Sequence, residues 1–295
     1  LGDVYKRQML QFSRTEIYMK KNLLEKLMGG VFLIAACVSI LAVVMICLFL
    51  FANGIPAIGK IGFFKFLTGE VWRPSNDIYG ILPFILGSLY VTAGAIIIGV
   101  PIGIMTAVFM ARFCPKKLHR ILKPAIDLLA GIPSVVYGFF GLVMIVPVTG
   151  SSIITASVIL AIMILPSVIS VSESALRAVP ESYYEGSLAL GATHERSVFS
   201  VLLPAASSGV FAGVVLGIGR AIGETMAVMM VAGNNTGMPK SIFKGVRTLT
   251  SNIAMEMGYA TGLHREALIA TGVVLFVFIL IINFCSSMLK RRNGR

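Results

Sequence analysis

The feature that most constrains this chain is the length of its charge-free stretches. Residues 29–52, 78–111 and 128–172 contain no charged side chain. A helix needs about 20 apolar residues to cross the hydrocarbon core of a bilayer, so residues 128–172 can supply two such helices. Only 13% of all residues are charged, whereas a soluble domain has about 25%. The sequence therefore predicts an all-α integral membrane protein.

Six transmembrane helices are predicted from these stretches and from two apolar runs nearer the C-terminus. Their expected positions are 29–52, a long segment within 78–111, two helices within 128–172 joined by a turn at 147–151, 206–232 and 267–289. Gly99 and Gly103, like Gly213 and Gly217, are four residues apart. This spacing of small residues favours close helix–helix packing.

The remaining residues form segments outside the membrane. We expect residues 1–28 to be a cytoplasmic N-terminal segment, 53–77 an outer loop, and 291–295 a cytoplasmic tail, with five of the six helices in the core 78–290. Residues 1–8 precede the first methionine, and we expect them to be extraneous to the fold.

The net charge of +12 arises from 25 Lys and Arg residues against 13 Asp and Glu. Such an excess is typical of nucleic-acid binding, anionic lipid binding or membrane topology. Most of the basic residues lie in the N-terminal segment, in 112–123, in 177–196 and at the C-terminus, all on one side of the predicted membrane. The positive-inside rule assigns that side to the cytoplasm, which leaves nucleic-acid binding without support.

Several kinds of site are disfavoured by the sequence. The four cysteines form no CxxC motif and the three histidines are scattered, so neither a disulfide framework nor a metal site is predicted. No glycine-rich stretch has the spacing of a nucleotide-binding loop. We therefore predict no cofactor, and any energy from ATP must come from a partner.

The polar stretch 178–204 is predicted to form two short helices. Pro180 followed by Glu181 favours a helix start, Gly191 interrupts the run, and Ala192-Thr193 begins a second helix. Two short helices on the cytoplasmic face indicate either a docking element for a partner or a helix lying on lipid. The residues alone leave these alternatives equally open.

The spacing within this stretch resembles the EAA loop of ABC-importer permeases. Glu185-Gly186-Ser187 is followed after three residues by Gly191, and after nine more by Val201-x-Leu203-Pro204. The chain departs from the family pattern at Gly186, Ser187 and Val201. The resemblance implies a type I importer permease of the MetI-like bundle, whose loop inserts into a separate ATPase subunit. The residues implied to form this coupling loop are Glu181, Glu185, Gly186, Ser187, Gly191, Ala192, Leu203 and Pro204.

Arg220 and Glu224 lie in the predicted fifth helix. A charged side chain near the bilayer centre costs about 2.5–3.5 kcal/mol on insertion scales, so such residues face a bundle interior or a polar path. Their four-residue spacing predicts neighbours on one helix face. The pair indicates either an internal ion pair that holds helices together or a path for a charged solute. Arginine favours an anion with phosphate or carboxylate oxygens.

Residues 220–234 closely resemble the C-type permease of the bacterial phosphate-specific importer, with support from 131–141 and from Arg73-Pro74-Ser75 before Tyr79-Gly80. The resemblance implies a multi-pass protein of the bacterial inner membrane. It also implies an A-type permease partner, a dimer of ATP-binding subunits, an extracytoplasmic phosphate-binding protein, and phosphate as the solute. The implied substrate path comprises Arg220, Glu224, Ser134, Tyr137 and Thr225.

The sequence leaves some alternatives open. The chain could be an A-type phosphate permease or a permease for sulfate or molybdate. Ser134 and Tyr137 follow a Gly-Ile-Pro break, which could equally be a packing kink. Residues 233–266 could contact a binding protein or form a solvated loop. An intramembrane enzyme would need a nucleophile–base pair, and a self-sufficient carrier would show repeated halves, neither of which the sequence suggests.

Overall fold

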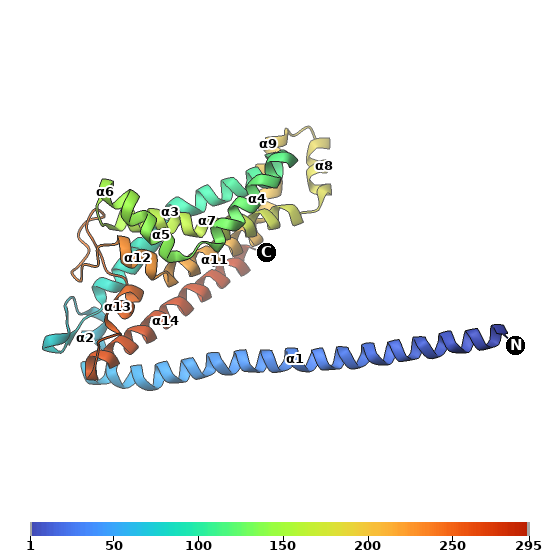
Figure 1. Cartoon of the computed structure of the whole chain (residues 1–295). Helices are drawn as coiled ribbons and strands as arrows, with labels where there is room; N and C mark the ends of the chain where they lie inside the picture. The colour runs from blue at the N-terminus through green and yellow to red at the C-terminus, as the bar shows by residue number, and fades with distance from the viewer. Residues whose placement is uncertain (1, 294–295) are drawn as a thin grey trace. The chain divides into compact units, whose positions relative to one another are not determined.

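The computed structural model describes the backbone of residues 2–293 and the side chains of residues 25, 27–285 and 288. Leu1 and the last two residues of the predicted tail lie outside this part of the chain. The helices and strands, shown in Figure 1, are α1 (Gly2–Ile61), α2 (Phe63–Thr68), β1 (Trp72–Arg73), β2 (Ile78–Tyr79), α3 (Leu82–Val108), α4 (Lys116–Gly131), α5 (Ser134–Phe140), α6 (Val146–Thr149), α7 (Ile153–Ala178), α8 (Glu181–Ala189), α9 (His194–Ser197), α10 (Leu203–Ala205), α11 (Ser207–Gly223), α12 (Met226–Val231), α13 (Leu249–Glu256) and α14 (Gly262–Asn293).

Short turns of other helical types connect several of these elements. Pro74–Asn76 forms a single turn of 3-10 helix, η1. The wider π-helical turns are η2 (Phe109–Phe113), η3 (Gly141–Ile145) and η4 (Val198–Leu202).

The chain divides into two units, residues 1–52 and 53–295. The first unit consists of the larger part of α1. Its described side chains are almost all exposed, including Phe32, Leu33 and Leu48. A helix that is apolar on every side is stable only where apolar surroundings replace water, which fits a membrane span.

The described residues include four helices that are long and apolar enough to cross a membrane, within α1, α3, α7 and α14. Two bent helix pairs raise the number to six if each pair counts as one span. The first pair is 116–131 with 134–149, bent by 96°, and the second is 194–205 with 207–223, bent by 70°. The predicted all-α membrane fold is therefore confirmed, and the predicted number of six spans is reached if each bent pair counts as one span.

In the second unit, α7 packs mainly against α3 and α11. Glycines at the contacts bring the helices close together. A Cβ atom on Gly103 would lie 2.8 Å from Val168 of α7, and one on Gly217 would lie 2.9 Å from the same side chain. The predicted role of the spaced glycines in packing is thus confirmed for these two positions.

The segment expected to be an outer loop, 53–77, is largely structured. Helix α1 continues through Pro56 to Ile61, α2 follows, and β1 pairs with β2 in an antiparallel hairpin with Trp72 opposite Tyr79. Phe66, Trp72 and Tyr79 are buried in one apolar cluster with residues of α3, α13 and α14. The expectation of a loop was wrong because these aromatic side chains fold the segment onto distant helices.

Candidate functional site

The predicted fifth helix is broken next to its charged pair. Helix α11 ends at Gly223, Glu224 has an extended backbone with φ −72° and ψ 126°, and α12 begins at Met226. Arg220 therefore lies in the last turn of α11, while Glu224 lies beyond its end. The prediction that the two side chains share one continuous helix face was wrong, and among the described side chains they form no ion pair.

Glu224 instead caps the next helix. Its Oε1 atom accepts hydrogen bonds from the backbone N–H groups of Thr225, at 3.2 Å, and Ala227, at 3.3 Å. The first N–H groups of a helix have no partner within it, so a carboxylate there stabilises α12. The break is held from outside as well, because the Thr250 hydroxyl donates to the Glu224 carbonyl at 3.1 Å.

Arg220 lies at a hollow between three membrane-spanning helices. The hollow has a volume of about 580 Å³ and is lined by Ser167 of α7, Arg220 of α11 and Asn283 of α14 together with small and apolar side chains. Polar groups on spanning helices typically face a protein interior or a water-filled cavity. Sequence reasoning missed Ser167 and Asn283, since isolated polar residues in apolar helices carry no local signal.

The other predicted path residues lie at the first break. Helix α4 ends at Gly131 and α5 begins at Ser134, after Pro133. Tyr137 is buried, and its hydroxyl donates to the backbone oxygen of Leu129 at 2.8 Å. This bond satisfies a carbonyl at the end of α4, so the hydroxyl stabilises the bend. Ser134 is half-buried.

The predicted pair of short helices on the loop 178–204 is present. Helix α8 begins at Glu181 after Pro180 and ends before Gly191, whose φ of 86° lies in the left-handed region. Thr193 caps α9, since its side chain accepts from the N–H of Arg196. We call residues 180–197 the docking loop. Figure 1 shows α8 and α9 projecting together at one end of the helices of the second unit.

The docking loop is internally fixed but largely exposed. The Tyr184 hydroxyl and His194 Nδ1 lie 2.8 Å apart, and Ser187 is buried. Glu185 and Gly186 are exposed, as is Leu190 at 91%. Ala192 is half-buried and closes the turn through a hydrogen bond from its N–H to the Ser187 carbonyl.

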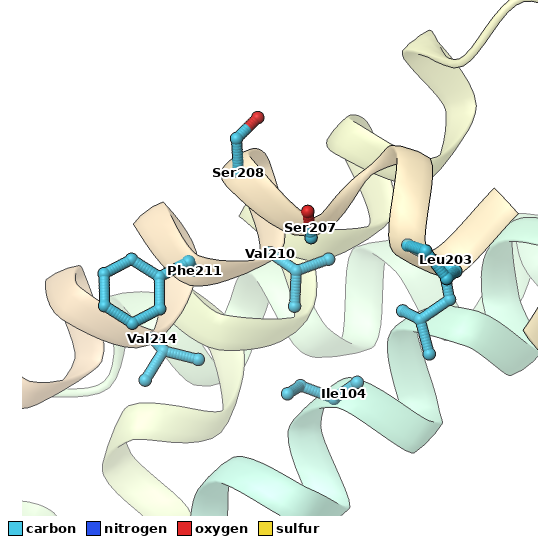
Figure 2. A pocket seen from close by; sticks show the side chains of 8 residues that line it. Ile104, Leu203, Ser207, Ser208, Val210, Phe211 and Val214 are labelled. Atoms are coloured by element: carbon cyan, nitrogen blue, oxygen red, sulfur yellow. The ribbon is translucent and has the colours of Figure 1, made fainter. Parts of the chain in front are cut away.

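The motif's last two residues lie farther along, at an apolar groove. Leu203 and Pro204 belong to α10 and line a groove of about 360 Å³ between α3 and α11. Figure 2 shows the side chains of Val210 and Leu203 directed toward Ile104, while the Ser208 hydroxyl points away from them. The EAA-type residues therefore divide between the exposed docking loop and the groove beside the 70° bend.

Two buried carboxylates were not predicted. Glu256 of α13 is 6% exposed and accepts from Trp72 Nε1 at 2.8 Å and from Arg247 Nη1 at 2.6 Å, with His264 Nε2 at 2.8 Å. Burial and a hydrogen bond to Asp77 raise the pKa of neighbouring Tyr79 to about 12. Residues 233–266 are thus not simply a solvated loop, because the Glu256 cluster anchors them.

The second carboxylate, Glu173 of α7, is 3% exposed. It contacts Arg177 of its own helix at 2.9 Å, and His119 at 2.7 Å and Lys123 at 3.3 Å from α4. Arg177 has the i, i+4 spacing of neighbours on one helix face, whereas His119 lies 54 residues away and no sequence spacing indicates it. In the described part of the chain, no three His, Cys, Asp or Glu side chains lie together as ligands for a metal ion.

Apolar spans bent at two points, an arginine at a hollow between spanning helices and a projecting loop are typical of the membrane subunit of a transporter. The model of one family, described as "Binding-protein-dependent transport system inner membrane component", matches residues 99–295. The match covers more than half of the chain. The chain therefore belongs to this family of ABC-importer permeases, whose members are transport components rather than enzymes, and it is a multi-pass inner membrane protein.

Relatives of known description agree over most of the chain. The "Probable ABC transporter permease protein YqgH" of Bacillus subtilis is 39% identical, over 96% of this chain and 98% of its own length. A "Phosphate transport system permease protein PstC" of Mesorhizobium japonicum is 36% identical over 83% of this chain and 84% of its own. The PstC protein of Pasteurella multocida is 34% identical over 79% and 82%. The resemblance to C-type permeases is confirmed.

Solved structures share the fold at lower identity. A chain of the MetNI methionine ABC transporter, in an inward-facing conformation, has a TM-score of 0.63 at 21% identity and covers 76% of this chain and 100% of its own. A chain of a bacterial alginate ABC transporter has a TM-score of 0.58 at 15% identity, over 86% and 93%. These similarities confirm the predicted MetI-like permease fold.

Proposed function

We propose that the chain is the C-type permease of an ATP-driven phosphate importer and that phosphate passes Arg220. The observation that carries this proposal is the position of Arg220 at a hollow that Ser167 and Asn283 also line, in a chain whose relatives include permeases named for phosphate transport. A guanidinium is always charged, and its planar fork matches phosphate oxygens. An arginine facing hydrocarbon would be costly, so its surroundings in the working protein are polar.

Ser167 and Asn283 line the same hollow and are proposed to extend the path. Glu224 and Thr225 contribute at the α11–α12 break, where the backbone of Glu224 is extended. Ser134 belongs to the path at the other break. Tyr137 acts there through its bond to Leu129, which fixes the bend.

The proposed partners are inferred from the sequence motifs and from the exposed apolar side chains of the docking loop. We propose that the docking loop binds a dimer of separate ATP-binding subunits, because the sequence has no nucleotide-binding loop of its own. Leu190, Tyr183 and Leu188 expose apolar surface there for such a contact. An A-type permease completes the path, and an extracytoplasmic phosphate-binding protein delivers the solute. Both termini are proposed to be cytoplasmic.

The test is radiolabelled phosphate uptake by the complete complex in proteoliposomes loaded with ATP. Uptake is expected to need ATP, to resist excess sulfate and molybdate, and to fall to background in Arg220→Gln with the complex still assembled. Arg265→Gln is the matched control, since Arg265 is an exposed arginine outside the hollow. Block by sulfate or molybdate would overturn the assigned solute, and normal uptake by Arg220→Gln would overturn the assigned path.

A further inference from the structure

Two arginines cross between the end of α3 and the end of α7. Arg112 lies in the π-helical turn η2 that follows α3, and its Nη2 donates to the Leu176 carbonyl of α7 at 3.1 Å. Arg177 lies in the last turn of α7, and its Nη2 donates to the Met110 carbonyl of η2 at 2.9 Å. An arginine of η2 therefore donates to a backbone carbonyl of α7, and an arginine of α7 donates to a backbone carbonyl of η2. We call Met110, Arg112, Leu176 and Arg177 the arginine clasp.

The clasp reaches directly into the docking loop. Arg112 Nη1 lies 3.0 Å from Oε2 of Glu181, the first residue of α8. The Arg112 side chain is only 12% exposed, whereas that of Glu181 is 59% exposed. The guanidinium is thus held among the helices and presents one edge to α8. Because its fork fixes two acceptors at set angles, Arg112 orients the start of α8 relative to the end of α7.

The other arm of the clasp reaches α4. Arg177 Nε donates to Glu173 Oε1 at 2.9 Å, and Glu173 also contacts His119 and Lys123 of α4. A buried carboxylate in a spanning helix is costly unless it is paired, so these contacts act together. One connected set of charged contacts therefore joins α8, η2, α7 and α4.

We propose that the arginine clasp transmits displacement of the docking loop to α3 and α4, with Arg112 as a positioning residue. The inference rests on the proposed function, because it needs an ATPase that moves α8. Only Val179 and Pro180 separate α7 from α8, and the side chains of α8 are largely exposed. Force applied at α8 thus reaches the spans through its ion pair and through Tyr184, which packs on the neighbouring apolar cluster.

The same geometry explains why a π-helical turn lies at this point. A π turn is a local widening of a helix that occurs frequently at functional sites. Here its Met110 carbonyl is the acceptor for Arg177. Since η2 accepts one arginine and supplies the other, a shift of α8 acts on η2 and α3 through these side-chain bonds in addition to the two-residue connection between α7 and α8.

The first test compares uptake with ATP hydrolysis in the full complex. In Arg112→Gln the ATPase is expected to co-purify and hydrolyse ATP, because Tyr184 still packs on the bundle. Solute taken up per ATP is expected to fall by roughly tenfold, if the coupled state loses about the stabilisation of one hydrogen bond. Arg112→Lys is expected to be intermediate, since an ammonium lacks the planar fork. The matched control is Arg120→Gln, an exposed arginine of α4. An unchanged ratio in Arg112→Gln overturns the proposal, as does a parallel loss of uptake and hydrolysis.

The second test does not depend on the solute. Spin labels are placed at Ile121 of α4 and Leu216 of α11, both exposed, after Cys37, Cys47, Cys114 and Cys285 are replaced by serine. ATP is expected to change the distance between the labels in the parent complex and to leave it unchanged in Arg112→Gln. The same change in label distance in both proteins would overturn the proposal that the clasp transmits the displacement. If phosphate is not the solute, phosphate uptake fails in the parent while this distance change persists.

Discussion

Arg247 Nη1 lies 2.6 Å from Glu256 Oε1, and both side chains are about nine-tenths buried. Arg247 precedes α13 and Glu256 ends it, while Trp72 from the outer hairpin donates to the other carboxylate oxygen. Glu256 therefore joins Arg247 to Trp72 of the hairpin, a residue that is 184 positions from Glu256 in the sequence. A buried ion pair of this kind fixes an arrangement because breaking it leaves an isolated charge.

Loss of the Glu256 charge is expected to destabilise strongly the packing of the Trp72 hairpin against α13. Glu256→Gln leaves Arg247 buried without a counter-charge, which typically costs about 3–5 kcal/mol. Glu266→Gln is the control, because its pair with Lys60 is 38% and 58% exposed and is worth less than about 1 kcal/mol. Denaturant unfolding in detergent micelles measures both. Equal effects of the two substitutions would contradict an anchoring role for Glu256.

Arg220 and Glu224 are expected to contribute independently to the free energy of unfolding. Glu224→Ala removes the cap of α12 and should cost about 1 kcal/mol of unfolding free energy, whereas Glu224→Gln keeps an acceptor oxygen and should cost less. Since Arg220 and Glu224 form no ion pair among the described side chains, the double variant Arg220→Gln/Glu224→Gln should be additive to within about 0.5 kcal/mol. A larger coupling energy in the denaturant cycle would mean that the two charges pair.

The docking loop was predictable from sequence because its signals are local. Pro180 before α8, Gly191 after it and Thr193 before α9 each act on their immediate neighbours. The membrane fold was predictable for a similar reason, since the apolar stretches must span a bilayer whatever their partners.

The break at Gly223 was not predictable from spacing alone. The apolar run continues through it, and the i, i+4 spacing of Arg220 and Glu224 indicates one helix face only if the helix is continuous. The Glu224 side chain competes by bonding the N–H groups of the next helix. The clasp and the contacts of His119 with Glu173 and of Trp72 with Glu256 join residues far apart in sequence, which a single sequence does not indicate.

Tyr137→Phe is expected to weaken the bend between α4 and α5 without abolishing transport. The substitution removes the hydroxyl that donates to Leu129 and keeps the buried ring, so the cost should be about 1 kcal/mol. For the unfolding measurement, Ser134→Ala is the matched hydroxyl loss on the same helix, where Ser134 is half-buried. Denaturant unfolding and phosphate uptake are measured together. Abolished uptake at unchanged stability in Tyr137→Phe would instead place its hydroxyl in direct contact with the solute.

Two glycines of the docking loop, Gly191 and Gly186, test whether its backbone conformation requires glycine, because steric clashes with the described residues are absent at both. A Cβ atom on Gly191 or on Gly186 would meet no atom within 4 Å, so neither substitution by alanine is blocked by a clash. Gly191 has a φ of 86°, which costs an L-residue about 1–2 kcal/mol, so Gly191→Ala should loosen the turn between α8 and α9. Gly186 lies inside α8, where alanine is favoured over glycine by about 1 kcal/mol.

Gly191→Ala is therefore expected to speed amide exchange in α8 and to reduce co-purification of the ATPase, while Gly186→Ala slows exchange and retains the ATPase. Equal exchange rates in the two variants would show that the left-handed turn does not hold the docking loop.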